Sequence, residues 1–254
     1  MRQNDIKNKI FSARSCLIGL SFLIVLMFSQ CMSPDEPDFE NYYFPHDNLE
    51  EGLIYKYEMS GSMAPEYWYL KSFIEKDSII LTITVYDAQQ RQSQLSRERR
   101  YPSGWVQKDL FLYEYDSSGT QRIDVDIIHD DLYPFRVQDS LDVTLYAASW
   151  ATEDGEEKVI NKLFRNRRWV GRDTLNIMGQ RIPSLVFRVY DWIEDERKGT
   201  LRIKMESNEY YGLNWGLLKK EQYVDGELFR SFHLADTLNM ETFEAIYKAQ
   251  TQSK

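Results

Sequence analysis

The chain has few of the residues and motifs that catalytic and metal sites usually require. Its 254 residues include three histidines and two cysteines, Cys16 and Cys31. No cysteine follows Cys31, so the rest of the chain must be stabilised by its core rather than by disulfides. It contains no G-x-S-x-G turn, no H-E-x-x-H motif and no glycine-rich phosphate loop. We therefore predict no enzyme activity, no catalytic residues, no cofactor and no metal site.

Positive charge is also scarce. Lys and Arg number 31 against 40 Asp and Glu, a net charge of −9. Residues 1–30 hold four basic residues and one acid, so the remainder has 27 basic residues against 39 acids, a net charge of −12. An acidic surface argues against a nucleic acid partner and against adhesion to anionic lipid. The sequence leaves the oligomeric state open.

One long hydrophobic run is present, at the amino terminus. Residues 1–15 carry a net positive charge, and residues 16–28 (CLIGLSFLIVLMF) are almost wholly apolar. A membrane-spanning helix needs ~20 apolar residues, and this run is shorter. A basic start, a short apolar run and a processing site predict a signal peptide over residues 1–30.

The cysteine after that run carries the strongest functional signal. Phe28-Ser29-Gln30-Cys31 resembles the lipobox of bacterial lipoproteins. The resemblance implies cleavage before Cys31 and acyl chains, palmitate among them, on that residue. Two or three chains on one residue make a membrane anchor effectively permanent. We predict a lipoprotein anchored to the outer membrane through Cys31, on its periplasmic face or at the cell surface. The alternative is cleavage by the ordinary signal peptidase, which would leave a free thiol.

The next segment, residues 31–48, is predicted to be a lipidated extended tether because it is rich in proline and acids. A second interpretation is that Asp35, Glu36 and Asp38 are a loose form of the acidic surface-export signal of some Bacteroidetes lipoproteins. Residues 49–254 are predicted to form a single antiparallel β domain.

Alternation of apolar and polar residues recurs through this domain, most clearly at 78–86, 122–128 and 201–206. Period two with one apolar face is typical of antiparallel strands that cover a core on one side. In the first run, Ile83 is expected in the core, with Thr82 and Thr84 on the opposite, wet face. Turn signals separate about ten or eleven candidate strands; they are Ser118-Gly119, Asp154-Gly155, Met178-Gly179 and Asp225-Gly226.

One helix is predicted near residues 240–250. Asn239 is a suitable N-cap, and acids in the first turn suit the helix dipole. Met240, Phe243 and Tyr247 share one face at helical spacing, so the helix is expected to pack on the sheet.

Several segments resemble uncharacterised Bacteroidetes lipoproteins that begin with a YFPL motif. The resemblance rests on Tyr43-Phe44-Pro45 with Gly52 and Tyr55-Lys56-Tyr57, on 173–179 with 186–189, and on 210–213 with 216–221. It implies an antiparallel sheet curved into an open half-barrel and implies no reaction. The predicted fold class is therefore mainly β: an antiparallel, strongly curved sheet or open half-barrel with one C-terminal helix.

Three segments are candidate sites. His129 has close acidic neighbours, but their spacing matches no known metal motif, and a turn with solvated charges is the favoured interpretation. The polar stretch 89–100 is either a mobile lid or a hairpin tip. A basic cluster around Trp169 either grips a phosphate or carboxylate or, as we favour, pairs with surface acids; it comprises Arg165, Arg167, Arg168 and Arg172.

We predict a non-catalytic binding or structural module of the cell envelope. Its partner besides the membrane is expected to be a small hydrophobic or anionic ligand in the half-barrel. The alternative is an envelope hydrolase that acts on glycan, with a carboxylate pair hidden among the many acids. An apolar interior would favour the first, and two converging carboxylates would favour the second.

Overall fold

The structure is a computed structural model that describes residues 38–60, 64–117, 119–137, 141–154, 157–196 and 200–252. Residues 38–254 form one compact unit, and the description below concerns that unit. A short helix α2 (Glu40–Tyr43) and a 3-10 helix η1 (His46–Asn48) precede the strands. The strands are β1 (Leu53–Met59), β2 (Glu66–Glu75), β3 (Ser78–Tyr86), β4 (Gln92–Tyr101), β5 (Gly104–Asp116), β6 (Gly119–Asp124), β7 (Asp126–Asp130), β8 (Tyr133–Pro134), β9 (Val143–Asp154), β10 (Glu157–Ile177), β11 (Gln180–Glu196), β12 (Thr200–Gly212), β13 (Gly216–Val224) and β14 (Glu227–Leu238).

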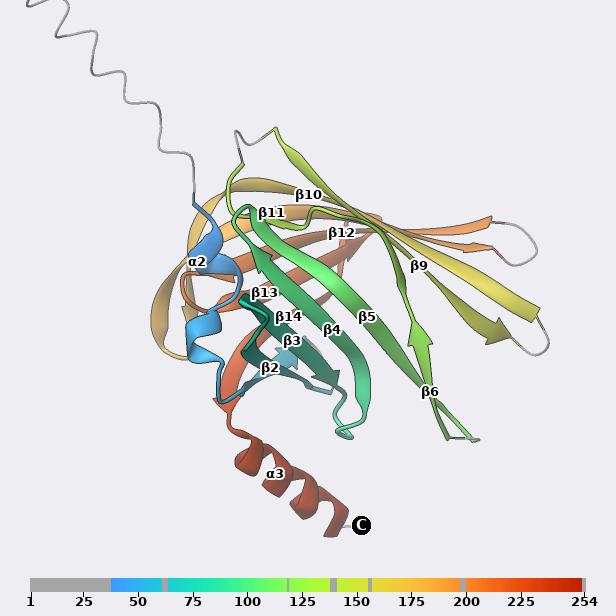
Figure 1. Ribbon diagram of the computed structural model, residues 1–254, viewed down its shortest axis with the longest axis horizontal. Coiled ribbons are helices and arrows are strands. Elements are labelled where there is room, and N and C mark those ends of the chain that lie inside the picture. Colours follow the sequence, from blue (N-terminus) through green and yellow to red (C-terminus); the bar gives the residue numbers. More distant parts are fainter. Residues whose placement is uncertain are drawn as a thin grey trace, which may run out of the picture. The chain divides into compact units, whose positions relative to one another are not determined.

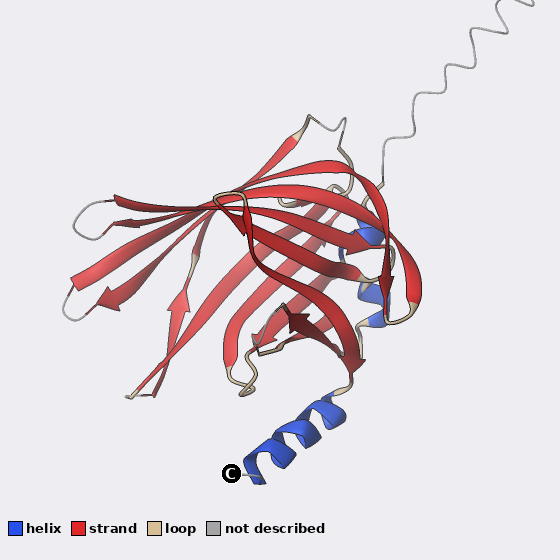
Figure 2. Ribbon diagram, turned by 180° about the vertical axis from the view of Figure 1, so that it is seen from behind, coloured by secondary structure: helices blue, strands red, loops and turns tan. Residues whose placement is uncertain are grey.

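These strands form one antiparallel sheet in the order β6-β5-β4-β3-β2-β1-β14-β13-β12-β11-β10-β9-β7, with β8 paired to β5. The sheet curls round a common interior, as both ribbon views show (Figures 1 and 2). Its two edges, β6 and β7, are consecutive in the chain and are separated by Val125, whose N–H donates to the Leu110 carbonyl at 3.0 Å. The predicted fold class, a strongly curved sheet or open half-barrel with one C-terminal helix, is confirmed.

Of the four predicted turns, two have both of their residues within the described ranges, namely Met178-Gly179 and Asp225-Gly226. Each of them forms a two-residue hairpin. Met178 and Gly179 have φ values of 49° and 76°, and Asp225 and Gly226 have 51° and 83°. Left-handed backbone at both central residues is the geometry that matches the twist of paired strands. The turns fix the register, with Ile177 opposite Gln180 and Val224 opposite Glu227.

The amino-terminal segment closes one end of the curved sheet. Phe39, Tyr43 and Leu49 are fully buried within the main core. The Asn41 carbonyl accepts a hydrogen bond of 2.7 Å from Asn214 N. At Gly216, where φ is 81°, a Cβ would lie 2.8 Å from the Tyr43 carbonyl oxygen, so the close approach requires glycine.

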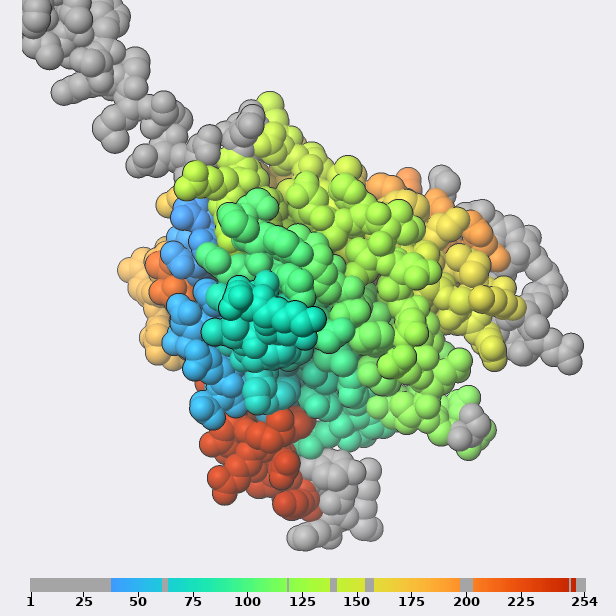
Figure 3. Space-filling model, viewed as in Figure 1, coloured from blue at the N-terminus to red at the C-terminus, as the bar shows by residue number. Residues whose placement is uncertain are grey.

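This packing corrects the carboxyl-terminal part of the predicted tether over 31–48, because the compact unit already begins at Asp38; residues 31–37 lie outside the described residues. The large apolar residues among the acids of that segment insert into the core, and the acidic composition concealed them. We refer to residues 39–49 as the plug. Figure 3 shows the plug, in blue, at the margin of the strands.

Helix α3 (Met240–Gln252) packs on the outer face of the sheet, as predicted. Asn239 caps it, because its Oδ1 accepts the Thr242 N–H at 2.8 Å. The Phe243 ring lies 5.1 Å from the Tyr67 ring and 5.4 Å from the Tyr86 ring, measured between centroids. No helix in the described ranges has both the length and the apolar character needed to cross a membrane.

Ile83 and Thr84 lie on opposite faces of β3, as predicted, but the expectation that Thr84 meets solvent is wrong. Ile83 is buried in the main core, but Thr84 is buried as well. Thr84 lies between Tyr69 and Leu95 in the register of the neighbouring strands, and these larger side chains flank it. The outer face of this strand is therefore not uniformly wet.

We expect Phe39→Ala to lower the free energy of unfolding by about 3–5 kcal/mol, because the ring is fully buried and its removal leaves a cavity. The matched control is Phe229→Ala, because Phe229 is 66% exposed; it should change stability by less than about 0.5 kcal/mol. Urea denaturation of both variants measures the difference. Equal stabilities would show that the plug is not part of the core.

Candidate functional site

A cavity of about 390 Å³ lies inside the curved sheet. Phe44 of the plug, Tyr133 and Leu217 form part of its wall at the plug end. Residues near the opposite strand ends, such as Ser93 and Arg230, also line it and are exposed or partly exposed. The mouth therefore lies opposite the plug. The wall combines aromatic and aliphatic side chains with charged ones, so the interior is not the uniformly apolar one that carriage of a hydrophobic ligand favours.

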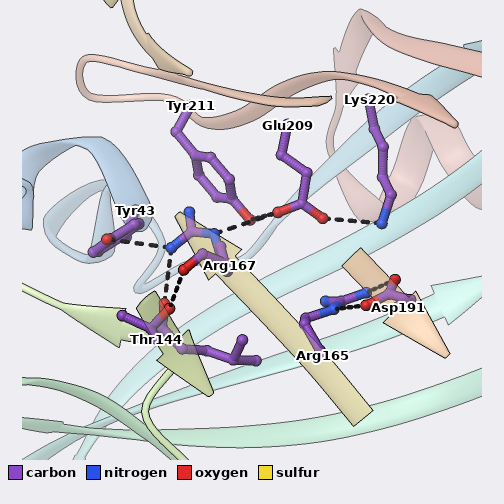
Figure 4. Close-up of polar contacts among 9 residues, drawn as sticks. Tyr43, Thr144, Arg165, Arg167, Asp191, Glu209, Tyr211 and Lys220 are labelled. Atoms are coloured by element: carbon purple, nitrogen blue, oxygen red, sulfur yellow. Dashed lines mark hydrogen bonds and ion pairs between the residues drawn. The ribbon is translucent and has the colours of Figure 1, made fainter. Parts of the chain in front are cut away.

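A buried guanidinium lies behind the wall of this cavity. Arg167 of β10 is 1% exposed, and its guanidinium carbon lies 3.5 Å from the Phe187 ring centroid. It also lies over the rings of Tyr43 at 5.1 Å and Tyr211 at 4.8 Å. Its Nη1 donates to the Leu132 carbonyl at 2.8 Å. One cation thereby joins the plug to β11, to β12 and to the segment that precedes β8. Figure 4 shows Arg167 between Tyr43 and Glu209.

Glu209 of β12 links this arginine to the cavity. Its carboxylate lies 3.5 Å from Arg167 Nε and accepts a hydrogen bond of 2.9 Å from Lys220 Nζ. Burial alone would raise the pKa of Glu209, but the charges of Lys220, Arg165 and Arg167 outweigh it and hold the pKa at about 2. Glu209 is therefore an anion whose oxygens are committed to structural partners.

Glu98 of β4 lies in the opposite electrostatic setting. It is 2% exposed, and its Oε1 accepts a hydrogen bond of 2.9 Å from Gln107 Nε2. Gln107 in turn accepts a hydrogen bond of 2.6 Å from the Tyr146 hydroxyl, while Glu98 Oε2 has no partner among the described residues. Burial, with a smaller contribution from Asp130, raises the pKa of Glu98 to about 8. Glu98 is therefore neutral at pH 7.

The structure divides the predicted basic cluster between two faces of β10. Arg165 and Arg167 point to the interior, since alternate residues of a strand share a face. Arg165 pairs with Asp191 at 2.7 Å and 2.9 Å. Arg168 lies on the other face, opposite Arg188, and Arg172 is exposed. The prediction that the arginines pair with acids is therefore confirmed for Arg165 and Arg167. The prediction that these pairs lie at the surface is wrong, because the partners Asp191 and Glu209 are buried.

The stretch 89–100 is neither a lid nor a hairpin tip over most of its length, because residues from Gln92 onward form strand β4. Its inward residues Gln94, Ser96 and Glu98 line the cavity, whereas the outward Arg97 pairs with Asp109. Because the interior is polar here, the strand has no apolar face for periodicity to reveal.

His129 is exposed in β7, so the predicted turn is wrong at that position. Asp130 accepts a hydrogen bond from Leu132 N at 3.1 Å. Within the described ranges, no group of three His, Cys, Asp or Glu side chains is arranged to hold a metal ion. Cys31 lies outside the described residues.

Comparison with solved structures identifies similar folds. A candidate exported protein with a YmcC-like fold from Bacteroides fragilis NCTC 9343 has a TM-score of 0.51 at 13% identity, covering 78% of this chain and 99% of that one. A candidate lipoprotein from Parabacteroides distasonis ATCC 8503 has a TM-score of 0.48 at 10% identity, with coverage of 78% and 99%. The hypothetical lipoprotein YmcC from Escherichia coli (K12) has 0.35 at 11% identity, with coverage of 78% and 91%.

At these identities the likeness to the Bacteroides fragilis protein concerns the fold alone. No family model matches the chain, and no curated protein matches it. The chain thus shares a curved antiparallel fold with this candidate exported protein. Evidence on its role comes from the side chains of its own interior.

We expect opposite results from neutralising the two buried glutamates. Glu209→Gln should lower the free energy of unfolding by about 3–5 kcal/mol at neutral pH, because it leaves buried cations without their partner.

Glu98 has its pKa raised in the folded state, so the wild type should lose stability as the pH rises from about 4.5 through about 8. Glu98→Gln should abolish this loss. Urea denaturation at several pH values in that range measures the free energy of unfolding of the wild type and of both variants. If Glu98→Gln and the wild type differed in stability by the same amount at every pH, the raised pKa of Glu98 would be contradicted.

Proposed function

We propose that this chain is a lipoprotein of the outer membrane, anchored through acyl chains on Cys31. The basic and apolar run of residues 1–28 and the lipobox-like Phe28–Cys31 support this proposal. The fold shared with a candidate exported protein of Bacteroides fragilis is compatible with an envelope location. The domain beyond the anchor would then act on the periplasmic face or at the cell surface.

We further propose that the interior of the sheet binds one small ligand without transforming it. The observation that carries this proposal is the cavity itself, which is closed by the plug at one end and lined by both aromatic and charged side chains. Small-molecule sites typically combine an apolar wall with a few placed polar groups in this way.

The volume limits the size of the ligand. At about 30 Å³ per water molecule, 390 Å³ corresponds to about 13 waters, near the lower end of ordinary ligand pockets. A compact organic molecule suits this space better than a lipid with two full acyl chains. This consideration favours a small ligand over bulk lipid carriage.

Hydrolysis of a glycan is a second candidate, because two carboxylates in one cavity have pKa values displaced in opposite directions. Glu98 is neutral and Glu209 is ionised, which is the pattern of an acid and its partner base or nucleophile. However, Glu209 is 3% exposed and its oxygens bind Lys220 and Tyr211. A carboxylate held in this way is poorly available to attack a sugar or a water, so binding is the better supported function.

Ligand binding can be tested by native mass spectrometry of the protein isolated gently from cell envelopes. We expect a small-molecule adduct that is lost in Ser96→Phe, because Ser96 is buried in the cavity wall and the ring would fill the space. Ser103→Phe is the control, since Ser103 is exposed and does not line this cavity. An adduct retained equally by both folded variants would place the ligand elsewhere. Consumption of envelope glycan by wild type, abolished in Glu98→Gln, would favour the hydrolase.

The anchor is tested separately by Cys31→Ser. We expect the variant to partition into the aqueous phase of a detergent separation and to lose labelling by radioactive palmitate, because acylation requires the cysteine sulfur. Ser29→Ala, two residues before the cysteine, should remain membrane-bound. Membrane retention and palmitate labelling of Cys31→Ser would contradict the lipobox assignment.

A further inference from the structure

The charged residues that line the cavity do not balance. Three cations line it, Arg165, Lys220 and Arg230, against two carboxylates other than Glu98, namely Glu66 and Glu209. With Glu98 neutral, the wall therefore has one more cation than it has anions. The chain that surrounds it is strongly acidic, with 40 Asp and Glu against 31 Lys and Arg. A positive interior in an acidic protein selects for an anion.

Arg230 of β14 has no counter-charge among the described residues. Arg165 pairs with Asp191, and Lys220 pairs with Glu209. Arg230 donates to the side-chain oxygen of Gln222, and no carboxylate of the described residues lies within ion-pair distance of it. A neutral amide orients the guanidinium without neutralising it. Arg230 can therefore still form a charge-assisted hydrogen bond with an acid group.

Apolar and aromatic side chains lie beside Arg230. Phe232 follows two residues later on the same face of β14 and also lines the cavity. The Phe232 ring lies 6.2 Å from the Trp68 ring, and Trp68 donates to Glu66 at 3.2 Å. The same region of the cavity therefore offers one cation for an acid group and two rings for an apolar body.

We propose that the cavity selects a small organic anion, whose acid group binds Arg230 and whose apolar body packs on Trp68 and Phe232. This inference rests on the proposed function, because it names the chemical class of the ligand in the same cavity. Carboxylates, sulfonates and phosphate esters share the required chemistry. Ionisation of Glu98 would bring the net charge of the wall to zero and weaken binding.

The groups around Glu98 are compatible with this role. Leu81 faces it from β3 in the register, and Gln107 faces it from β5. The neighbouring titratable or charged groups on other elements are Asp130 of β7, Tyr133 of β8 and Tyr146 of β9, with Arg165, Glu209 and Lys220 on other parts of the cavity wall. Burial raises the pKa values of both tyrosines above their usual range, so they stay neutral. Among these groups, Glu98 is the one whose charge changes near pH 8.

The inference can be tested with two fluorescent probes that share an aromatic body. The first, 8-anilinonaphthalene-1-sulfonate, is an anion, and the second, N-phenyl-1-naphthylamine, is neutral. We expect Arg230→Gln to weaken binding of the sulfonate about tenfold, the loss typical of one charged hydrogen bond, and to leave the amine nearly unchanged. Arg122→Gln is the matched control, because Arg122 is exposed and lies outside the cavity. Arg230→Lys should keep most of the affinity, which separates loss of charge from misfolding.

The pH dependence gives a second, independent readout. Sulfonate binding should fall severalfold between about pH 6 and about pH 9 in wild type and stay constant in Glu98→Gln, whereas amine binding should not change with pH. Equal affinity for both probes, unaffected by Arg230→Gln, would overturn the anion inference and leave the binding function standing. If Ser96→Phe left the affinity for both probes unchanged, neither would bind in the cavity, and the proposed function would fail as well.

Discussion

The structure depends on one buried cation, Arg167. Removing a guanidinium from water costs several kcal/mol, and the site offsets that cost with aromatic faces, backbone and side-chain acceptors and the Glu209 carboxylate. Its partners come from the plug, β8, β11 and β12, which are far apart in sequence. Glu209 also accepts a hydrogen bond from Lys220. The contact between Arg167 and Glu209 therefore helps to determine where Lys220 places its positive charge at the cavity wall.

The sheet could be predicted from the sequence wherever one face of a strand is apolar. The strand over 78–86, the turns at Met178-Gly179 and Asp225-Gly226 and the helix after Asn239 follow from local patterns. The run at 201–206 also lies in a strand, but Ile203 is 47% exposed, so the prediction that its apolar face covers the core is wrong there. The run at 122–128 is not one strand, because it is divided between β6 and β7 at Val125. The expected number of strands was too low, since the described residues contain 14. Strand β4 was missed because its inward residues are polar, and the plug was missed because its core residues are interspersed with acids.

The candidate site could be predicted only in part. Arg165 and Arg167 stand out in the sequence as a basic cluster, but the acids that pair with them lie 26 and 42 residues further along the chain, at Asp191 and Glu209. Glu98 resembles any surface glutamate in a polar stretch. Its neutrality depends on burial against Gln107 and Tyr146, which the tertiary fold alone creates. Burial cannot be inferred from local pattern when the interior itself is polar.

The closure of the sheet by its own first residues has a consequence for how the chain reaches its native state. Tyr43 contacts an arginine 124 residues away, and the Tyr57 hydroxyl donates to a carbonyl 160 residues away. Strand β1 pairs with β14, the last strand. A chain that is synthesised amino end first must therefore hold the plug and β1 without these partners until nearly all of it is available. Such long-range closure makes folding slow and leaves the waiting segment prone to aggregation until its partners are available.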